Sequence, residues 1–259
     1  MGRRKGGIFV GAAICGLAGA AALGAQDVPS PHDAQPERPT VATHAGTVAP
    51  GWFEIESGIE RDRVGPGVAS LATPTLLKFG VASHVQLDLA VTTARPSSAQ
   101  ALGLGDAAIA VKWRLLDDAP IVGDFALQPS LKAPTGSALR GTGTGTTDAS
   151  LLAISSHVIG PVSLDINVGY TRRSARGDLA NAMLWTVSTG TTVAGPLAFA
   201  AELYGYPGFG GPASVGFLAG PTYAVHPWFV ADAGFIAHVA GAQPPAVYAG
   251  LTWNVGRLW

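Results

Sequence analysis

The chain has 259 residues, of which 13% are charged and 47% are hydrophobic, and its formal net charge is -1. Soluble domains usually carry roughly 25% charged residues, yet no uninterrupted apolar run long enough for a spanning helix follows residue 25. This combination indicates either a β-barrel membrane protein or an unusually Gly/Ala-rich soluble one. The near-zero net charge gives no reason to expect a nucleic-acid partner, and we expect none.

Residues 1–25 have the pattern of a secretory signal peptide. The segment begins with Arg3, Arg4 and Lys5, continues with an apolar Gly/Ala-rich stretch and ends in small residues, so we expect cleavage near Ala25–Gln26. Cys15 is the single cysteine of the chain. The mature protein would therefore contain no disulfide, no thiolate nucleophile and no cysteine metal site.

Residues 26–49 are proline-rich, polar and without hydrophobic periodicity. This composition is typical of disordered segments, so we expect a disordered lead-in between the signal peptide and a folded unit that spans residues 50–259. His32 and His44 lie in this lead-in. We interpret both as solvated linker histidines, and we expect no metal site.

The first predicted strand, Trp52–Arg61, alternates an apolar face with a face that carries Glu54, Glu56 and Glu60. Alternation with a period of two is the signature of a strand whose two sides meet different media. Three glutamates on one strand face require water or cations opposite them.

The stretch Thr73–Thr92 is predicted to form two strands joined by a tight turn at Ala82–Ser83. Its leucines and valines share one face, whereas Lys78 and Asp88 point the other way. In a soluble sandwich these charges would face water outside, and in a membrane barrel they would face a wet lumen. Because they lie on neighbouring strands, we expect Lys78 and Asp88 to pair across the hairpin.

Further alternating segments bring the total to about twelve strands. They are Leu104–Leu116, Gly123–Ala133, Ala149–Val158, Val162–Thr171, Met183–Val193, Leu197–Tyr204, Ser214–Ala224, Trp228–Ile236 and Val247–Val255. The connections alternate between short turns and longer loops, and a soluble sandwich is not expected to sort its loops in this way. The pattern predicts an all-β fold, a transmembrane antiparallel up-and-down β-barrel of about twelve strands.

The charged face of these strands predicts a set of inward-facing residues: Glu54, Glu56, Glu60, Lys78, Asp88, Lys112, Arg114, Lys132, Asp165, Glu202 and Asp232. Eight strands leave an interior that side chains fill and sixteen leave an open channel, so about twelve should leave a narrow lumen. Two interpretations stay open. The charges form a network that plugs or stiffens the barrel, or they form the polar lining of a permeation path.

Several segments, taken in order, resemble a known family. They include PGWFEIESGIE, TPTLLKFGVASHVQLDLAV, GLGDAAIAVKWRLL, PSLKAPTGS, INVGY, AELYGY and AGPTYAVHPWFVADAGF. Together they are similar to the transporter-like outer-membrane family associated with the meta-pathway of phenol degradation. The resemblance implies a barrel in the outer membrane of a Gram-negative bacterium, surrounded by outer-membrane lipid. It also implies passive uptake of small hydrophobic or aromatic compounds, without cofactor or enzymatic activity, and it transfers no functional residue.

Two alternatives stay open beside a channel. An outer-membrane lipid hydrolase would need a nucleophile and a base on one strand face, and Ser155 and His157 have that spacing. No Gly-x-Ser-x-Gly motif or acidic partner lies nearby. A non-transporting structural or surface barrel is the other alternative, in which the charged loop Arg172–Asp178 would bind anionic surface groups.

Overall fold

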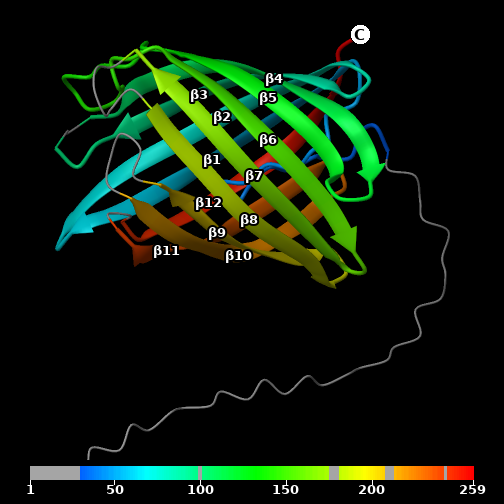
Figure 1. The fold of residues 1–259 in the computed structure, drawn as a ribbon. Coiled ribbons are helices and arrows are strands. Elements are labelled where there is room, and N and C mark those ends of the chain that lie inside the picture. The colour runs from blue at the N-terminus through cyan, green and yellow to red at the C-terminus, as the bar shows by residue number, and fades with distance from the viewer. Residues whose placement is uncertain (1–29, 99–100, 175–180, 208–212, 242–243) are drawn as a thin grey trace, which may run out of the picture.

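The computed structural model describes residues 30–98, 101–174, 181–207, 213–241 and 244–259, and in them the strands close into one antiparallel barrel (Figure 1). Each strand pairs with its neighbours in sequence, and β1 pairs with β12 to close the ring. The strands are β1 (Trp52–Gly65), β2 (Val68–Ala82), β3 (Val85–Arg95), β4 (Gly103–Ala119), β5 (Gly123–Ala133), β6 (Asp148–Ile159), β7 (Val162–Arg173), β8 (Asn181–Ala194), β9 (Leu197–Tyr206), β10 (Ser214–His226), β11 (Phe229–Ala240) and β12 (Ala246–Arg257). The predicted fold class is confirmed.

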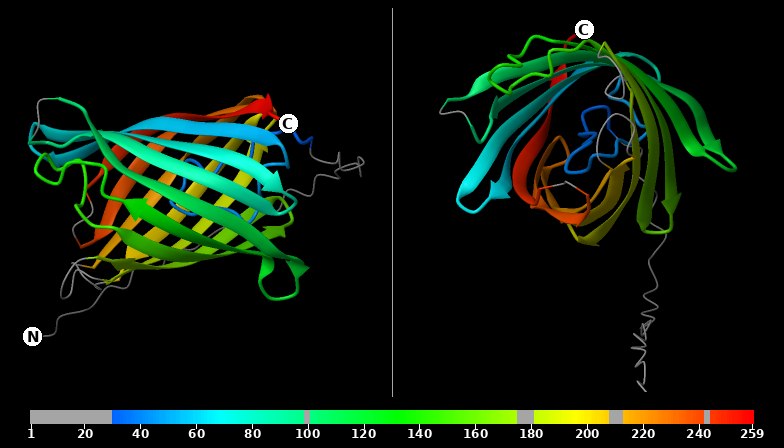
Figure 2. Two further views of the ribbon diagram at one scale, coloured as in Figure 1. Left: turned by 90° about the horizontal axis from the view of Figure 1, so that it is seen from above. Right: turned by 60° about the vertical axis from the view of Figure 1, so that its left-hand side comes forward.

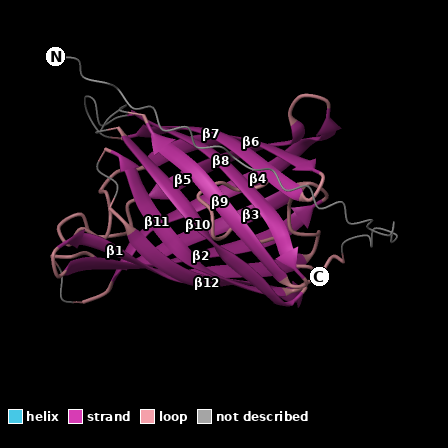
Figure 3. Cartoon of the chain, turned by 90° about the horizontal axis from the view of Figure 1, so that it is seen from below, coloured by secondary structure: helices cyan, strands magenta, loops and turns pink. Residues whose placement is uncertain are grey.

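The described residues are strands and loops (Figure 3). Among these residues, no helix has the length and apolar character needed to cross a membrane. The signal peptide predicted for residues 1–25 and its cleavage site lie outside the described residues.

The two ends of the barrel differ in their connections. The turns from even-numbered to odd-numbered strands are short, and the start of β1 and the end of β12 lie at the same end, which we call the short-turn end. The other end, the long-loop end, carries connections such as residues 134–147. One long-loop connection is shorter than expected, because β1 and β2 stay paired as far as Gly65 and Val68 and leave only Pro66–Gly67 as a turn.

The barrel has an apolar outside and a polar inside. Large hydrophobic side chains such as Val168, Val187 and Phe235 are exposed on the outer wall. Glu54 and Lys78, by contrast, are 0% exposed. This inversion of a soluble core is the pattern of a barrel whose outer wall faces lipid.

Residues 30–51 lie inside the barrel, and we call them the plug segment. The right-hand view of Figure 2 shows this blue segment within the ring of strands. Ala42, Ala45 and Val48 are at most 2% exposed. The disordered lead-in predicted for residues 26–49 is therefore not what the structure shows for residues 30–49, while residues 26–29 lie outside the described part. The segment lacks periodicity because its backbone bonds to the barrel wall and not to a regular partner strand.

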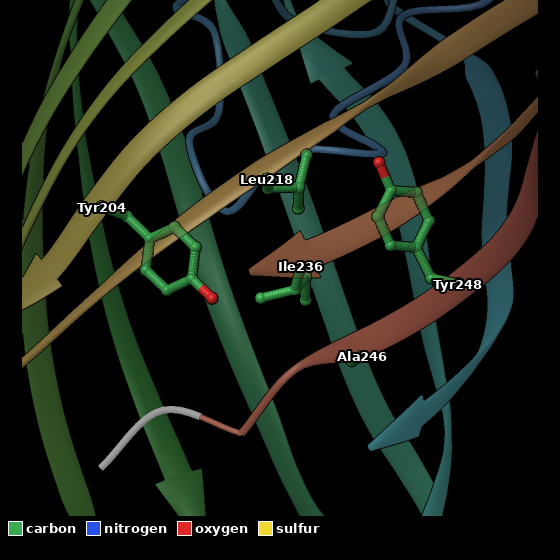
Figure 4. Packing of buried hydrophobic residues seen from close by; sticks show 5 residues of the cluster. All are labelled: Tyr204, Leu218, Ile236, Ala246 and Tyr248. Atoms are coloured by element: carbon green, nitrogen blue, oxygen red, sulfur yellow. The ribbon is translucent and has the colours of Figure 1, made fainter. Parts of the chain in front are cut away.

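An apolar cluster lies on the inner wall of β9–β12 toward the long-loop end. Its members, from four neighbouring strands, are Tyr204, Leu218, Ile236, Ala246 and Tyr248 (Figure 4). Val41 of the plug segment packs against this cluster. The inner wall is therefore not polar along its whole height.

A charge on the outer wall tests which face meets lipid. Val187 lies midway along β8 and is 43% exposed, so Val187→Arg should destabilise the barrel by about 2–4 kcal/mol because lipid cannot solvate the guanidinium. Denaturant unfolding of the protein in lipid vesicles measures this. Ile121→Arg, in the exposed turn between β4 and β5, is the matched control and should cost little. Equal costs at the two positions would contradict the lipid-facing assignment.

Candidate functional site: the lumen and its plug segment

Lys78 holds the first part of the plug segment against β1 and β2. Its Nζ lies 2.5 Å from a carboxylate oxygen of Glu54 and 2.5 Å from one of Glu56. It also donates to the carbonyl oxygen of Gln35 at 2.5 Å. The two glutamates in turn accept the backbone N–H groups of Gln35 and Glu37, at 2.8 and 2.7 Å. One buried ammonium and two carboxylates are therefore satisfied only together with the plug backbone.

The expected pair between Lys78 and Asp88 does not form, although the two residues are register partners on β2 and β3. Lys78 is used by the two glutamates. Asp88 instead accepts hydrogen bonds from Gln86 at 2.8 Å and from Gln128 at 2.7 Å. The prediction of a cross-hairpin pair was wrong because the plug segment and β1 supply nearer partners.

Lys112 on β4 is a second anchor for the plug segment. Its ammonium pairs with the carboxylate of Glu37. It also donates to Thr43 Oγ1 at 2.9 Å, to the carbonyl of His44 at 3.0 Å and to that of Gly46 at 3.3 Å. Every one of these groups belongs to residues 30–51, so within the described residues the plug segment supplies all the hydrogen-bond and ion-pair partners of this 0% exposed cation of the wall.

Arg38 makes a third anchor, on β11. Its guanidinium forms a two-point ion pair with Asp232, with both N–O distances 3.1 Å. Two glycines of the wall, Gly58 on β1 and Gly250 on β12, make room for it, because a Cβ atom at either position would lie within 2.6 Å of the guanidinium. Larger side chains at these positions would displace Arg38.

Neutral and anionic acceptors along the wall bind the backbone of the rest of the plug segment. Glu202 accepts from the N–H groups of Val41 and Ala42, both at 2.7 Å. Asn167 makes two bonds to Thr43, one to its N–H and one to its carbonyl. Further along, the wall side chains of Ser156 and Gln86 accept backbone N–H groups of the segment at 2.8 Å.

The other predicted inward residues lie away from the plug contacts. Lys132 forms ion pairs at the long-loop end with Asp106 at 2.9 Å and Asp148 at 3.0 Å. Arg114 pairs at the short-turn end with Asp117 and Asp124. Asp165 accepts from Ser156 at 2.6 Å, and Glu60 is half-buried on β1. The predicted set thus divides into plug anchors, two clusters near the barrel ends, and Glu60, Asp88 and Asp165, which belong to neither group.

Three cavities remain around the plug segment. A vestibule of about 720 Å³ opens on its short-turn side, between the segment and the wall of β4–β10. A cavity of about 260 Å³ lies between the segment and β1–β3. A third, of about 320 Å³, lies against β2–β8 toward the long loops and shares Leu76 and Ala90 with the second. Arg38 and Thr40 line both the vestibule and the second cavity, so this part of the plug segment separates them.

The buried contacts of the plug segment strongly shift the pKa values of two of its ionisable groups. Burial raises the pKa of the Glu37 carboxyl, but the ammonium groups of Lys112 and Lys78 outweigh that effect and hold it well below its ordinary value. Burial and the Lys112 ammonium lower the pKa of His44 from 6.5 to about 3. The docked segment therefore holds an ionised Glu37 and a neutral His44.

The alternative of a Ser–His hydrolase meets a different geometry. Ser155 Oγ lies 3.0 Å from His157 Nε2, but it donates its proton to the carbonyl of Val122 at 2.7 Å. A serine nucleophile has to give that proton to the histidine. The neighbouring Ser156 faces the lumen, where it bonds Ala45, so Ser155 and His157 lie on the outer face. Of the loop Arg172–Asp178, residues 175–178 lie outside the described part.

Sequence reasoning missed the plug segment and the apolar inner wall. The second could have been found, because Leu76, Leu152, Leu184 and Leu218 occupy the positions that the alternation assigns to the inside. The plug segment carried no comparable signal, since most of its contacts are made by backbone groups, which nearly every residue offers, and only a few by side chains such as Glu37 and Arg38.

Removal of Lys112 should loosen the plug segment. Lys112→Met leaves Glu37 buried without its main partner, and breaking a buried ion pair typically costs about 3–5 kcal/mol. The measurement uses a reporter cysteine, Thr40→Cys, in a Cys15→Ser background. Lys112→Met should make labelling of this cysteine by a water-soluble thiol reagent at least about tenfold faster. A tenfold change corresponds to a loss of only ~1.4 kcal/mol in the free energy of docking. Lys132→Met is the control, because Lys132 does not contact the plug segment. Equal labelling in both variants would contradict the anchoring role.

Acidification should also loosen the plug segment. A released His44 takes up a proton below about pH 6.5, whereas the docked one stays neutral down to a pKa of about 3, so docking weakens as the pH falls through that interval. Glu37 adds a further loss below its ordinary value of 4.5. Planar-bilayer recordings should show a rise in open probability from about pH 7 to about pH 4. His44→Gln should flatten the upper part of this rise, and His226→Gln, outside the segment, should not. If His44→Gln left the pH dependence of the open probability unchanged, His44 would have no part in the acid response.

Comparisons with solved structures agree on the fold. An outer membrane channel of Pseudomonas putida F1 is similar with a TM-score of 0.58 at 12% identity, covering 81% of this chain and 97% of that one. The KdgM porin has a TM-score of 0.52 at 9% identity, covering 77% and 98%. The NanC porin has a TM-score of 0.52 at 11% identity, covering 78% and 100%. At these identities the likeness establishes the barrel fold, which these channels and porins share.

Sequence comparison assigns the family. Among curated proteins, none matches this chain. A family model described as "Putative MetA-pathway of phenol degradation" matches residues 37–251, which include most of the plug segment and nearly the whole barrel. The match starts within the plug segment, at the residue that Lys112 binds. The chain belongs to this family of the MetA-pathway of phenol degradation.

Proposed function

We propose that this protein is an outer-membrane channel for passive uptake of small hydrophobic or aromatic compounds, and that the plug segment closes it at rest. The observation that carries the proposal is the pair of cavities on either side of Arg38 and Thr40, one toward the short turns and one toward the long loops. A barrel whose lumen was filled by its own side chains would not have two such cavities following each other along the lumen.

The orientation follows from the barrel ends. Outer-membrane barrels have short periplasmic turns and longer extracellular loops, so the short-turn end is the periplasmic one. The plug segment both enters and leaves there: the N–H of Ala34 bonds the carbonyl of Pro227 in a short turn, and the segment leads directly into Trp52 at the start of β1. It can therefore withdraw into the periplasm without unthreading from the barrel.

The solute class follows from the inner wall toward the long loops. Tyr204, Leu218 and Ile236 line one side, and Leu76, Leu152 and Leu184 line the other. A wall of this kind is favourable for apolar solutes, and the family description names phenol degradation. Sugars and ions would find few partners on it.

A structural barrel without transport is the alternative. The same buried network would then serve only to stiffen the wall, and the plug segment would never leave. The plug geometry favours the channel, because the ring of strands closes without the segment and Lys78 keeps its partners Glu54 and Glu56 on the wall when the segment leaves.

Deletion of residues 31–48 tests the two functions against each other. In liposome-swelling assays with phenol as solute, the deletion variant should swell faster than the intact protein, because the lumen becomes continuous. The control is Leu139→Asn, a change at a fully exposed position of a long loop, which should swell like the intact protein. Equal rates for both variants and for empty liposomes would favour the structural barrel.

A further inference from the structure

We propose that the cavity of about 320 Å³ toward the long loops is a binding site for one uncharged, mainly apolar molecule that carries a hydroxyl or N–H donor. This inference rests on the proposed function and adds a residence site to it. The cavity is larger than the ~150 Å³ that suffices for benzene in an apolar cavity, so it holds a molecule of one or two rings.

The walls of this site are mostly apolar and smooth. Leu76 on β2, Leu152 on β6 and Leu184 on β8 provide the large apolar side chains. Small residues lie beside them: Ala90 is the register partner of Leu76, and Gly169 is that of Leu152 and Leu184. Ala108 and Ala110 follow on β4. All lie at inward positions of their strands. A flat apolar solute gains burial here without displacing any charged group.

Two polar groups of the site, both on β5, are free to accept a hydrogen bond, whereas Ser150 on β6 and Thr171 on β7 bond each other. Gln128 uses its Nε2 to bind Asp88 at 2.7 Å, so its Oε1 is the free end of the amide. Within the described part of the chain, neither that oxygen nor the Ser130 hydroxyl has a hydrogen-bond partner, and both residues line the cavity. A hydroxyl or N–H donor of a ligand fits this pair.

The charge at the site argues against anions. Asp88 lines the cavity and accepts hydrogen bonds at both carboxylate oxygens, from Gln86 and Gln128, as an ionised carboxylate does. The cations Lys78 and Lys112, which could balance a ligand carboxylate, bind the plug segment and do not line this cavity. A ligand cation would lose its hydration against three leucines.

An ion cluster lies beyond the cavity toward the long loops. The lumen-facing residues one step further along β4–β7 form an ion cluster in which Lys132 pairs with Asp106 and Asp148. Asp106 additionally accepts from the backbone of Gly136 and Thr144 in the long loop between β5 and β6. The site thus lies between a loop-capped entrance and the plug segment, where a solute would rest before release.

Calorimetric titration of the full chain in lipid nanodiscs, with empty nanodiscs as blank, tests the site with three naphthalenes. We expect saturable binding of 2-naphthol, binding of naphthalene weaker by about tenfold for the missing hydrogen bond, and no saturable binding of 2-naphthoate. Saturable binding of the naphthoate at the strength of the naphthol would overturn the proposal, as would tighter binding of the cation 2-(aminomethyl)naphthalene.

Two variants locate the binding. Ala108→Trp should fill the cavity and abolish saturable binding, while Ala107→Trp, the same change one residue away on the outer face of β4, should preserve it. Gln128→Met keeps the volume and should weaken 2-naphthol about tenfold without affecting naphthalene. Unchanged 2-naphthol affinity in Ala108→Trp or in Gln128→Met overturns the site. Binding without liposome swelling would instead contradict the proposed uptake and leave the site intact.

Discussion

The structure depends on one constraint, which is that charges inside a narrow barrel must find partners where little water can reach them. Glu54, Lys78 and Lys112 are all 0% exposed, and an unpaired buried charge is far costlier than a buried pair. The strands alone do not meet this need, because in the described part of the chain Lys112 finds its hydrogen-bond and ion-pair partners in residues 30–51. The plug segment is therefore part of the folded barrel and not an appendage.

This requirement divides the lumen along its axis. Toward the short turns, charged and amide side chains of the wall hold the backbone of the plug segment. Toward the long loops the wall becomes apolar, with Tyr248 and Leu218 on one side and Leu152 on the other. One half of the lumen is polar and filled by the plug segment, and the other half is mainly apolar and hollow. This arrangement fits the proposed channel, in which a solute would bind in the hollow half before the plug segment moves away.

The same anchors make docking of the plug segment sensitive to mutation and to pH. Each anchor joins a wall charge to a backbone or side-chain group of residues 30–51, so a change that weakens one leaves several groups unsatisfied together. His44 and Glu37 make this sensitive to acid, since the docked segment excludes a proton from both. Under the proposed function, the network would be a closure of finite strength, which is the property a gated channel needs.

The sequence by itself determined the about twelve strands and the side of the wall on which each charge lies, because alternation in stretches such as Val162–Thr171 leaves only two faces. The sorting of its connections into short turns and longer loops predicted the closed barrel. Which residues these charges pair with was decided by the tertiary structure alone. Lys78 pairs with β1 and the plug segment and not with Asp88, since closure of the ring brings β1 beside β2. Residues 30–51 look disordered as a sequence because much of their order comes from bonds between their backbone and side chains of eight strands, and no local pattern encodes such a bond.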